Sequence, residues 1–103
     1  MDYLVDFIIT VPEGTPTSEL EQRTTGEVTR VAELAAQGHA LRVWKPLPAD
    51  GRSRAVGLYR AADDTELQAI LDSLPLRPWM EISVRALAEH PNDPALRSNK
   101  ERL

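Results

Sequence analysis

The stretch DDTELQAILDSLPLRPWMEISVRAL, residues 63–87, contains a helix pattern and a strand pattern joined by two prolines. Residues 63–74 begin with acidic side chains and then repeat apolar ones three or four positions apart, which predicts an amphipathic helix. Residues 80–87 alternate apolar and polar side chains, which predicts a strand with one covered face. Pro75 ends the helix and Pro78 keeps the chain extended into the strand.

The rest of the chain adds one helix and three strands. An opening run rich in β-branched and aromatic residues predicts a strand. A glycine at the end of a helical pattern predicts the end of a helix. The Asp50-Gly51 pair between two short apolar runs predicts a hairpin turn. The predictions are a strand over residues 3–11, a helix from Thr15 or Thr17 to Gly38, and a hairpin of strands 39–47 and 53–61.

The element order βαββαβ predicts an α+β fold of the ferredoxin-like kind, with a four-stranded antiparallel sheet and both helices on one face. The other face of the sheet is uncovered in a single copy. We expect its lining to include Leu4, Ile8, Trp44 and Tyr59, which is too apolar a surface to leave in water. A second copy that covers this face is the simplest solution, so we expect a homo-oligomer formed through the sheet.

Length and composition limit the possible functions. A chain of 103 residues predicts one domain, here residues 1–90, followed by a polar tail or partner arm at 91–103. The net charge of −4 gives no reason to expect nucleic acid, and no apolar run predicts a signal peptide or a membrane span, so we expect a cytoplasmic protein. The absence of cysteine, and the distance in sequence between His39 and His90, argue against a metal site.

One carboxylate interrupts the apolar face of the first predicted helix. The positions of that face are Leu20, Thr24, Glu27, Val31 and Leu34. A carboxylate that faces a core loses hydration, which raises its pKa and suits it to general acid–base chemistry. The alternative is that Glu27 lies at the edge of this face and pairs with Arg23 or Arg30 at helical spacing.

Several cationic and aromatic residues are candidates for binding an organic anion. Arg42 and Trp44 share a face of their predicted strand, and such a pair suits a substrate that has a carboxylate and an apolar body. Lys45 follows them, and Arg54 is the hairpin arginine best placed for an anion. Trp79, at the end of the sheet, is placed to close a pocket or fill a subunit seam. The alternative is that these side chains are solvated charges and core anchors.

Two stretches resemble a known family. They are EVTRVAELAAQGHALRVWK, residues 27–45, and LDSLPLRPWMEISVRALAEHP, residues 71–91. The second contains a leucine-proline-leucine, any residue, proline, aromatic, methionine phrase, then an acidic residue, an alternating strand and His90-Pro91. Over about residues 3–92 the chain resembles the muconolactone Δ-isomerase family of small, cofactor-free enzymes of aromatic catabolism in the β-ketoadipate pathway.

This resemblance implies a lactone substrate with a carboxylate arm, a homo-oligomer (a dimer or a higher state such as a decamer), and pockets near subunit contacts. Glu27 matches a family glutamate at the same distance from the helix-ending glycine, which implies that it is the catalytic base. No cofactor or metal is implied. The residues expected to bind the substrate are Arg42, Lys45 or Arg54 at its carboxylate and Trp44, Tyr59 and Trp79 as apolar walls.

The hairpin departs from the family and keeps two alternatives open. The stretch PLPADGRSRAVG, residues 46–57, is longer than in the family's muconolactone enzyme and lacks its histidine-tyrosine and asparagine-tyrosine pairs. One alternative is therefore the same fold acting on another metabolite, such as a polyketide, as an isomerase, a cyclase or a monooxygenase-like protein. The other is a non-enzymatic oligomeric binding module, in which Glu27 is solvated.

Overall fold

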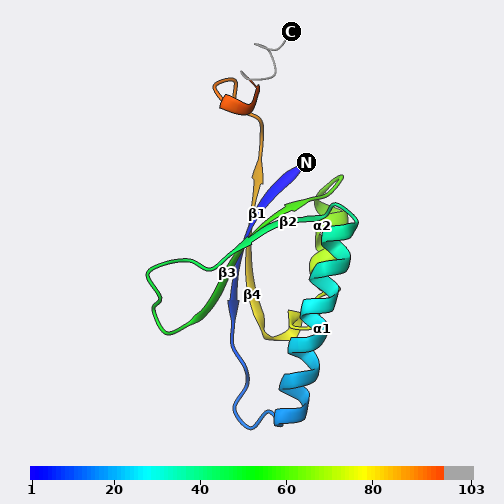
Figure 1. Cartoon of the computed structure of the whole chain (residues 1–103), viewed down its shortest axis with the longest axis vertical. Coiled ribbons are helices and arrows are strands. Elements are labelled where there is room, and N and C mark those ends of the chain that lie inside the picture. The colour runs from blue at the N-terminus through cyan, green and yellow to red at the C-terminus, as the bar shows by residue number, and fades with distance from the viewer. Residues whose placement is uncertain (97–103) are drawn as a thin grey trace.

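The computed structural model describes residues 1–96 (Figure 1). The elements follow the predicted βαββαβ order, with one short 3₁₀ helix added before the last strand. They are β1 (Asp2–Ile9), α1 (Thr17–Ala36), β2 (Ala40–Trp44), β3 (Ser53–Arg60), α2 (Asp64–Asp72), η1 (Arg77–Trp79) and β4 (Met80–Leu87).

The four strands form one sheet in the order β2-β3-β1-β4, and each neighbouring pair is antiparallel. Both helices lie on one side of this sheet (Figure 1). The insertion of β3 between β1 and β2, and of β1 between β3 and β4, is the split-βαβ arrangement. The predicted ferredoxin-like α+β fold is therefore confirmed.

The alternation read in residues 80–87 corresponds to the two faces of β4. Met80 pairs with Ile9 and Ile82 pairs with Phe7, and these side chains pack in or against the core. Glu81 occupies the position between them and is exposed. Side chains two positions apart in a strand share a face, so the helix-covered side of the sheet receives the apolar half of the pattern.

The core lies between the sheet and the helices and includes a pair of tyrosines. Tyr3 and Tyr59 face each other across β1 and β3 and are 1% and 2% exposed. We expected Tyr59 on the uncovered face, and this placement was wrong. The register puts it beside Tyr3 on the helix-covered face, where burial of its ring contributes to the core.

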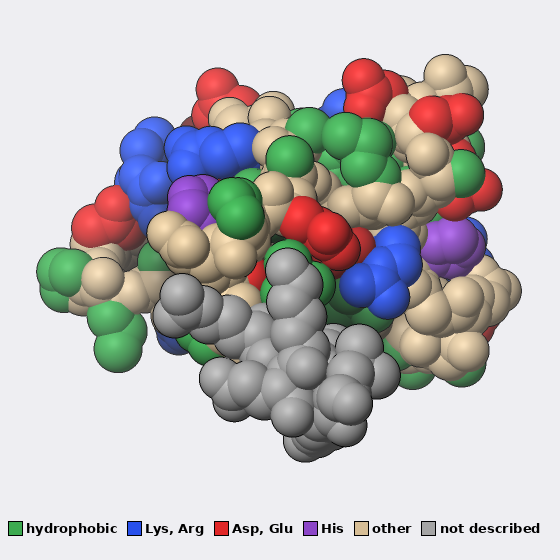
Figure 2. All heavy atoms as spheres, turned by 90° about the horizontal axis from the view of Figure 1, so that it is seen from above, with side chains coloured by type: hydrophobic (Ala, Val, Ile, Leu, Met, Phe, Trp, Pro, Cys, Tyr) green, Lys and Arg blue, Asp and Glu red, His purple; other side chains and the backbone are tan. Residues whose placement is uncertain are grey.

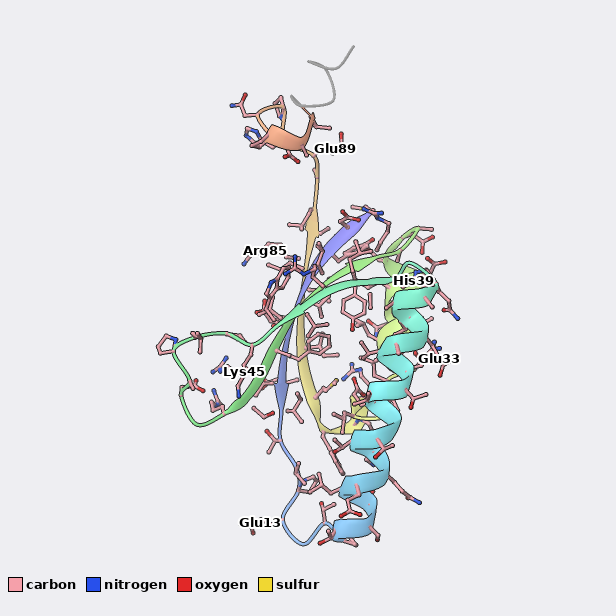
Figure 3. The ribbon with its side chains drawn as sticks, viewed as in Figure 1. Glu13, Glu33, His39, Lys45, Arg85 and Glu89 are labelled. Atoms are coloured by element: carbon pink, nitrogen blue, oxygen red, sulfur yellow. The ribbon has the colours of Figure 1, made fainter. Side chains whose placement is uncertain are left out.

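The opposite face of the sheet carries the other residues expected there. Leu4 and Ile8 alternate with the buried side chains of β1, and Trp44 is 40% exposed. Charged side chains lie among them, including Asp6 and Arg85, and Figure 3 shows Arg85 away from the helices. Figure 2 shows a different surface, the end of the molecule at which the N-terminus lies, where acidic and basic side chains lie among hydrophobic ones.

The two helices begin differently. The side chain of Asp63 accepts a hydrogen bond from the Glu66 backbone, which is an ordinary N-cap for α2. At α1 the N-cap position is Pro16, and Thr15 donates its hydroxyl to the carbonyl oxygen of Pro12 instead. We expected Thr15 or Thr17 as the N-cap of α1, and this prediction was wrong, because the N-cap position is Pro16 and no side chain within residues 1–96 caps the helix. Gly38 ends α1 with a φ of +83°, as expected.

The chain leaves the sheet after β4. Residues 88–96 extend away from the sheet (Figure 1), and the remainder of the predicted tail, 97–103, lies outside the described residues. The division into a domain at 1–90 and an arm at 91–103 stays a prediction. Within residues 1–96, no helix is long and apolar enough to cross a membrane.

Candidate active site

A cavity of about 360 Å³ lies between α1 and the helix-covered face of the sheet. This volume is in the range of small-molecule sites. Two of its lining side chains, Glu27 and Tyr59, are polar, and the others are apolar. The lining consists of Phe7, Ile9, Glu27, Val28, Val31, Val43, Ala55, Tyr59, Leu76 and Met80.

Glu27 reaches the cavity because it shares a helix face with residues of the core. Leu34 is buried and Val31 packs against the core cluster, so the position one turn earlier also points toward the sheet. The Oε1 atom of Glu27 accepts a hydrogen bond of 3.0 Å from the backbone N–H of Leu76. Its partial burial and this single anchor hold the carboxylate in an apolar environment.

The expected alternative for Glu27, an ion pair with a neighbouring arginine, is wrong. Arg23 pairs with Glu19 at 3.2 Å, and Arg30 pairs with Glu33 at 3.4 Å. In the part of the chain that the structure describes, no ion pair includes Glu27. Burial raises the pKa of Glu27, and the hydrogen bond from Leu76 offsets part of that rise.

The segment between α2 and β4 supplies the anchor. Pro75 has no N–H and follows the end of α2 closely, and the 3₁₀ turn uses the backbone N–H groups of Arg77 and Trp79 for bonds to Leu74 and Leu76. The N–H of Leu76 is left over and turns toward α1. The two prolines predicted a stiff joint here, but no sequence signal indicates which backbone N–H it presents.

The Tyr59 ring forms the floor of the cavity and lies across the backbone of β3. A Cβ atom at Gly57 would be 2.5 Å from the Cε1 atom of Tyr59, so only glycine leaves room for the ring. Phe7 packs beside it, with ring centroids 6.2 Å apart. Burial, and then the negative charge of Glu27, raise the pKa of Tyr59 to about 12.

Both tyrosines of the chain are expected to stay protonated well above pH 10, where an ordinary tyrosine is half ionised. Burial and its hydrogen bond to Asp64 raise the pKa of Tyr3 to about 12 as well. Absorbance of tyrosinate against pH measures this directly, with the urea-unfolded chain as the control. Glu27→Gln should lower the midpoint of Tyr59 by removing a negative charge. Ionisation of Tyr59 near pH 10 in the folded chain would show that the cavity floor is hydrated.

Four other predicted site residues lie away from the cavity. Arg42 stacks over Trp44 at 4.9 Å, and strand register places both on the uncovered face of the sheet with Arg54. Arg54 pairs with Asp50 at 3.0 Å. Lys45 lies on the hairpin that projects away from α1 (Figure 3). One chain alone therefore does not bring these cations and Glu27 to one ligand.

Trp79 lies at the end of the sheet, as expected, but outside the cavity lining. It is 9% exposed, and the guanidinium of Arg23 lies 5.1 Å from its ring centroid. Its carbonyl oxygen accepts a hydrogen bond from the Thr10 backbone, which ties η1 to the end of β1. Within residues 1–96 no three His, Asp or Glu side chains are grouped as metal ligands.

The fold and the cavity define a small ferredoxin-like α+β protein with one half-buried carboxylate in the cavity between helix and sheet. The sequence profile described as Muconolactone delta-isomerase matches residues 1–93. The chain belongs to the muconolactone delta-isomerase family.

Individual relatives agree with this assignment. Muconolactone Delta-isomerase of Acinetobacter baylyi is 30% identical over 92 residues, covering 89% of this chain and 93% of the relative. The enzyme of the same name from Cupriavidus pinatubonensis is 26% identical, covering 89% and 97%. A crystal structure of muconolactone isomerase superposes with a TM-score of 0.80 at 22% identity, covering 90% and 94%, and supports the fold. The predicted family and isomerase class are confirmed.

Proposed function

We propose that this chain isomerises an unsaturated lactone carboxylate of the muconolactone type, with Glu27 as the proton carrier. Both relatives described above are named for this reaction. The observation that carries the proposal is the half-buried Glu27 carboxylate, held by a single backbone anchor in a cavity whose other lining side chains are apolar except for Tyr59. A carboxylate whose pKa is raised by burial is a stronger base than a solvated one, which suits it to remove a proton from carbon.

The proposed reaction moves one proton and no net electrons. The carboxylate of Glu27 takes a proton from the carbon next to the unsaturated lactone system, so that the C–H bond breaks and an O–H bond forms. The electron pair left on carbon spreads into the conjugated lactone. The protonated Glu27 then returns the proton at the other end of that system, and the double bond shifts. This cycle needs no cofactor, and the absence of one stays a prediction.

A homo-oligomer is part of the proposal, because the cations and the base lie on opposite sides of the sheet. Arg42 and Arg54 are on the uncovered face, whereas Glu27 faces the helix-covered cavity. A clamp on the substrate carboxylate by either arginine therefore requires a second copy of the chain. Apolar side chains at Leu4 and other positions of the uncovered face support contact between copies. The cytoplasmic location stays a prediction.

The proposal is tested by incubating the purified chain with (+)-muconolactone and following loss of the conjugated lactone and formation of the enol-lactone product by absorbance and NMR. We expect catalytic turnover well above the rate of the same mixture without protein. A folded wild-type chain that leaves (+)-muconolactone unchanged would contradict the substrate assignment. The altered hairpin at residues 46–57 would then direct the search to a different metabolite for the same base.

A further inference from the structure

One peptide group in the segment between α2 and β4 is held at both ends by side chains of α1. The Nη1 atom of Arg23 donates a hydrogen bond of 2.7 Å to the carbonyl oxygen of Pro75. The N–H of Leu76 donates one of 3.0 Å to Glu27. That carbonyl and that N–H belong to the same peptide bond, which is planar and rigid. The contact at the oxygen therefore constrains the direction of the N–H.

Arg23 is itself held in place. Its Nε atom donates to Glu19 at 3.2 Å, and its guanidinium lies over the Trp79 ring at 5.1 Å. A guanidinium is planar, with donors in fixed directions, so these contacts together orient the Nη1 donor. Arg23 and Glu27 are four residues apart and lie on the same face of α1. The helix thus presents the donor and the acceptor for one peptide group at adjacent turns.

A glycine lets the segment approach the helix closely. A Cβ atom at Gly26 would be 3.3 Å from the Cγ atom of Pro75, which is closer than ordinary contact. Glycine in a helix interior costs about 1 kcal/mol relative to alanine, so its presence inside α1 needs a compensating reason. Close packing of Pro75 on α1, which brings the Leu76 N–H within reach of Glu27, is such a reason.

We propose that Arg23 is a positioning residue for Glu27: it orients the Pro75–Leu76 peptide so that its N–H holds one carboxylate oxygen and leaves the other for the substrate proton. This inference rests on the proposed function only for the last step. Within residues 1–96 the Oε2 atom of Glu27 has no protein hydrogen-bond partner. The positive charge at the carbonyl oxygen also polarises the peptide and strengthens its N–H as a donor.

The groups around Glu27 determine the direction in which its pKa changes when Arg23 is removed. Tyr59 faces it from β3, Arg30 lies on α1 and pairs with Glu33, and Arg77 pairs with Asp72 in the neighbouring segment. Loss of Arg23 weakens the hydrogen bond from Leu76, which favours the charged carboxylate of Glu27. Burial then raises the pKa of Glu27 further. The midpoint of Glu27 titration should then rise.

The test compares Arg23→Met with Arg30→Met. Both remove an arginine from α1 that contacts the segment after α2, but Arg30 donates to the Ser73 hydroxyl and not to the Pro75–Leu76 peptide. Glu27 titration is followed by ¹³C NMR of its labelled carboxyl carbon, together with the pH dependence of kcat. We expect Arg23→Met to move both midpoints upward and, because the carboxylate is less well positioned, to lower kcat by about tenfold. Arg30→Met should change neither.

A second variant separates position from stability. Gly26→Ala adds a methyl group against Pro75 and should raise the Glu27 midpoint while the better helix former maintains Tm. It carries the test if Arg23→Met fails to fold. The proposal is overturned if folded Arg23→Met leaves both midpoints unchanged, or if Arg30→Met shifts them equally. If Arg23→Met does not fold, unchanged midpoints in Gly26→Ala overturn the proposal instead. Midpoint shifts in a chain that does not convert (+)-muconolactone would retain the positioning role and reject the substrate.

Discussion

Replacement of Glu27 by glutamine is expected to lower kcat for lactone isomerisation about a thousandfold while the fold persists. General base catalysis by a positioned side chain contributes about 10²–10⁴ in rate, and an amide cannot accept the proton. The Oε1 atom of glutamine can still accept the hydrogen bond from Leu76, so the side chain should keep its place. The measurement is kcat by absorbance, with circular dichroism to verify the fold.

The control for this prediction is Glu33→Gln, which changes an exposed glutamate of the same helix outside the cavity lining. It should keep wild-type activity. If Glu27→Gln and Glu33→Gln are equally active, the carboxylate in the cavity is not the base. If both are inactive, the loss comes from the helix and not from the cavity.

The same variant should also change the pH dependence of stability. Burial raises the pKa of Glu27 in the folded chain, so the folded state holds this proton at pH values where the unfolded state has released it. Stability from this group is therefore greatest below the ordinary glutamate pKa and falls as pH rises through the folded pKa. Glu27→Gln removes that fall. It should gain stability relative to wild type at neutral pH, measured by urea unfolding at several pH values.

Gly57→Ala is expected to destabilise the fold by about 1–3 kcal/mol, the usual cost of overpacking a core. The added methyl group would be 2.5 Å from the Tyr59 ring and 3.4 Å from Phe7, both of which are buried. The ring must move, and because Tyr59 forms the floor of the cavity, activity should fall along with stability. Urea unfolding gives the first effect, and kcat/KM gives the second.

A double-mutant cycle that combines Gly57→Ala with Tyr59→Ala tests whether the Tyr59 ring causes the loss of stability. Without the ring, Gly57→Ala should cost much less than it does in wild type, because the contact at 2.5 Å no longer exists. An undiminished cost in the Tyr59→Ala background would show that the ring is not what glycine accommodates. The requirement for glycine at position 57 would then have a different cause.

The sequence predicted the element order and β4 because both depend on local patterns. Alternation in residues 80–87 and helical spacing in 63–74 are readable without knowledge of the fold. The face occupied by Tyr59 was not readable in the same way. In a strand, a shift of one residue in register moves every side chain to the other face, and the pairing of Tyr59 with Tyr3 is a contact between distant segments.

For a similar reason, only part of the candidate site could be predicted from the sequence. Glu27 could be found because it interrupts an apolar helix face. The N–H of Leu76 and the contact of Arg23 with Pro75 could not, because backbone groups in an irregular segment have no sequence pattern. The cations at Arg42 and Arg54 were expected near the base, but periodicity indicates which residues share a face and not which side of the sheet that face occupies.

The most direct test of the central claim is to compare two titrations of the wild-type chain: the acid limb of kcat/KM for (+)-muconolactone and the ¹³C NMR titration of the Glu27 carboxyl group. The kcat/KM profile reports the essential base in the free enzyme. If Glu27 is that base, both curves share one midpoint, and it lies above the ordinary glutamate value of about 4.3. A Glu27 midpoint that lies at the ordinary value, or that differs from the kinetic one, would contradict the assignment of Glu27 as the proton carrier.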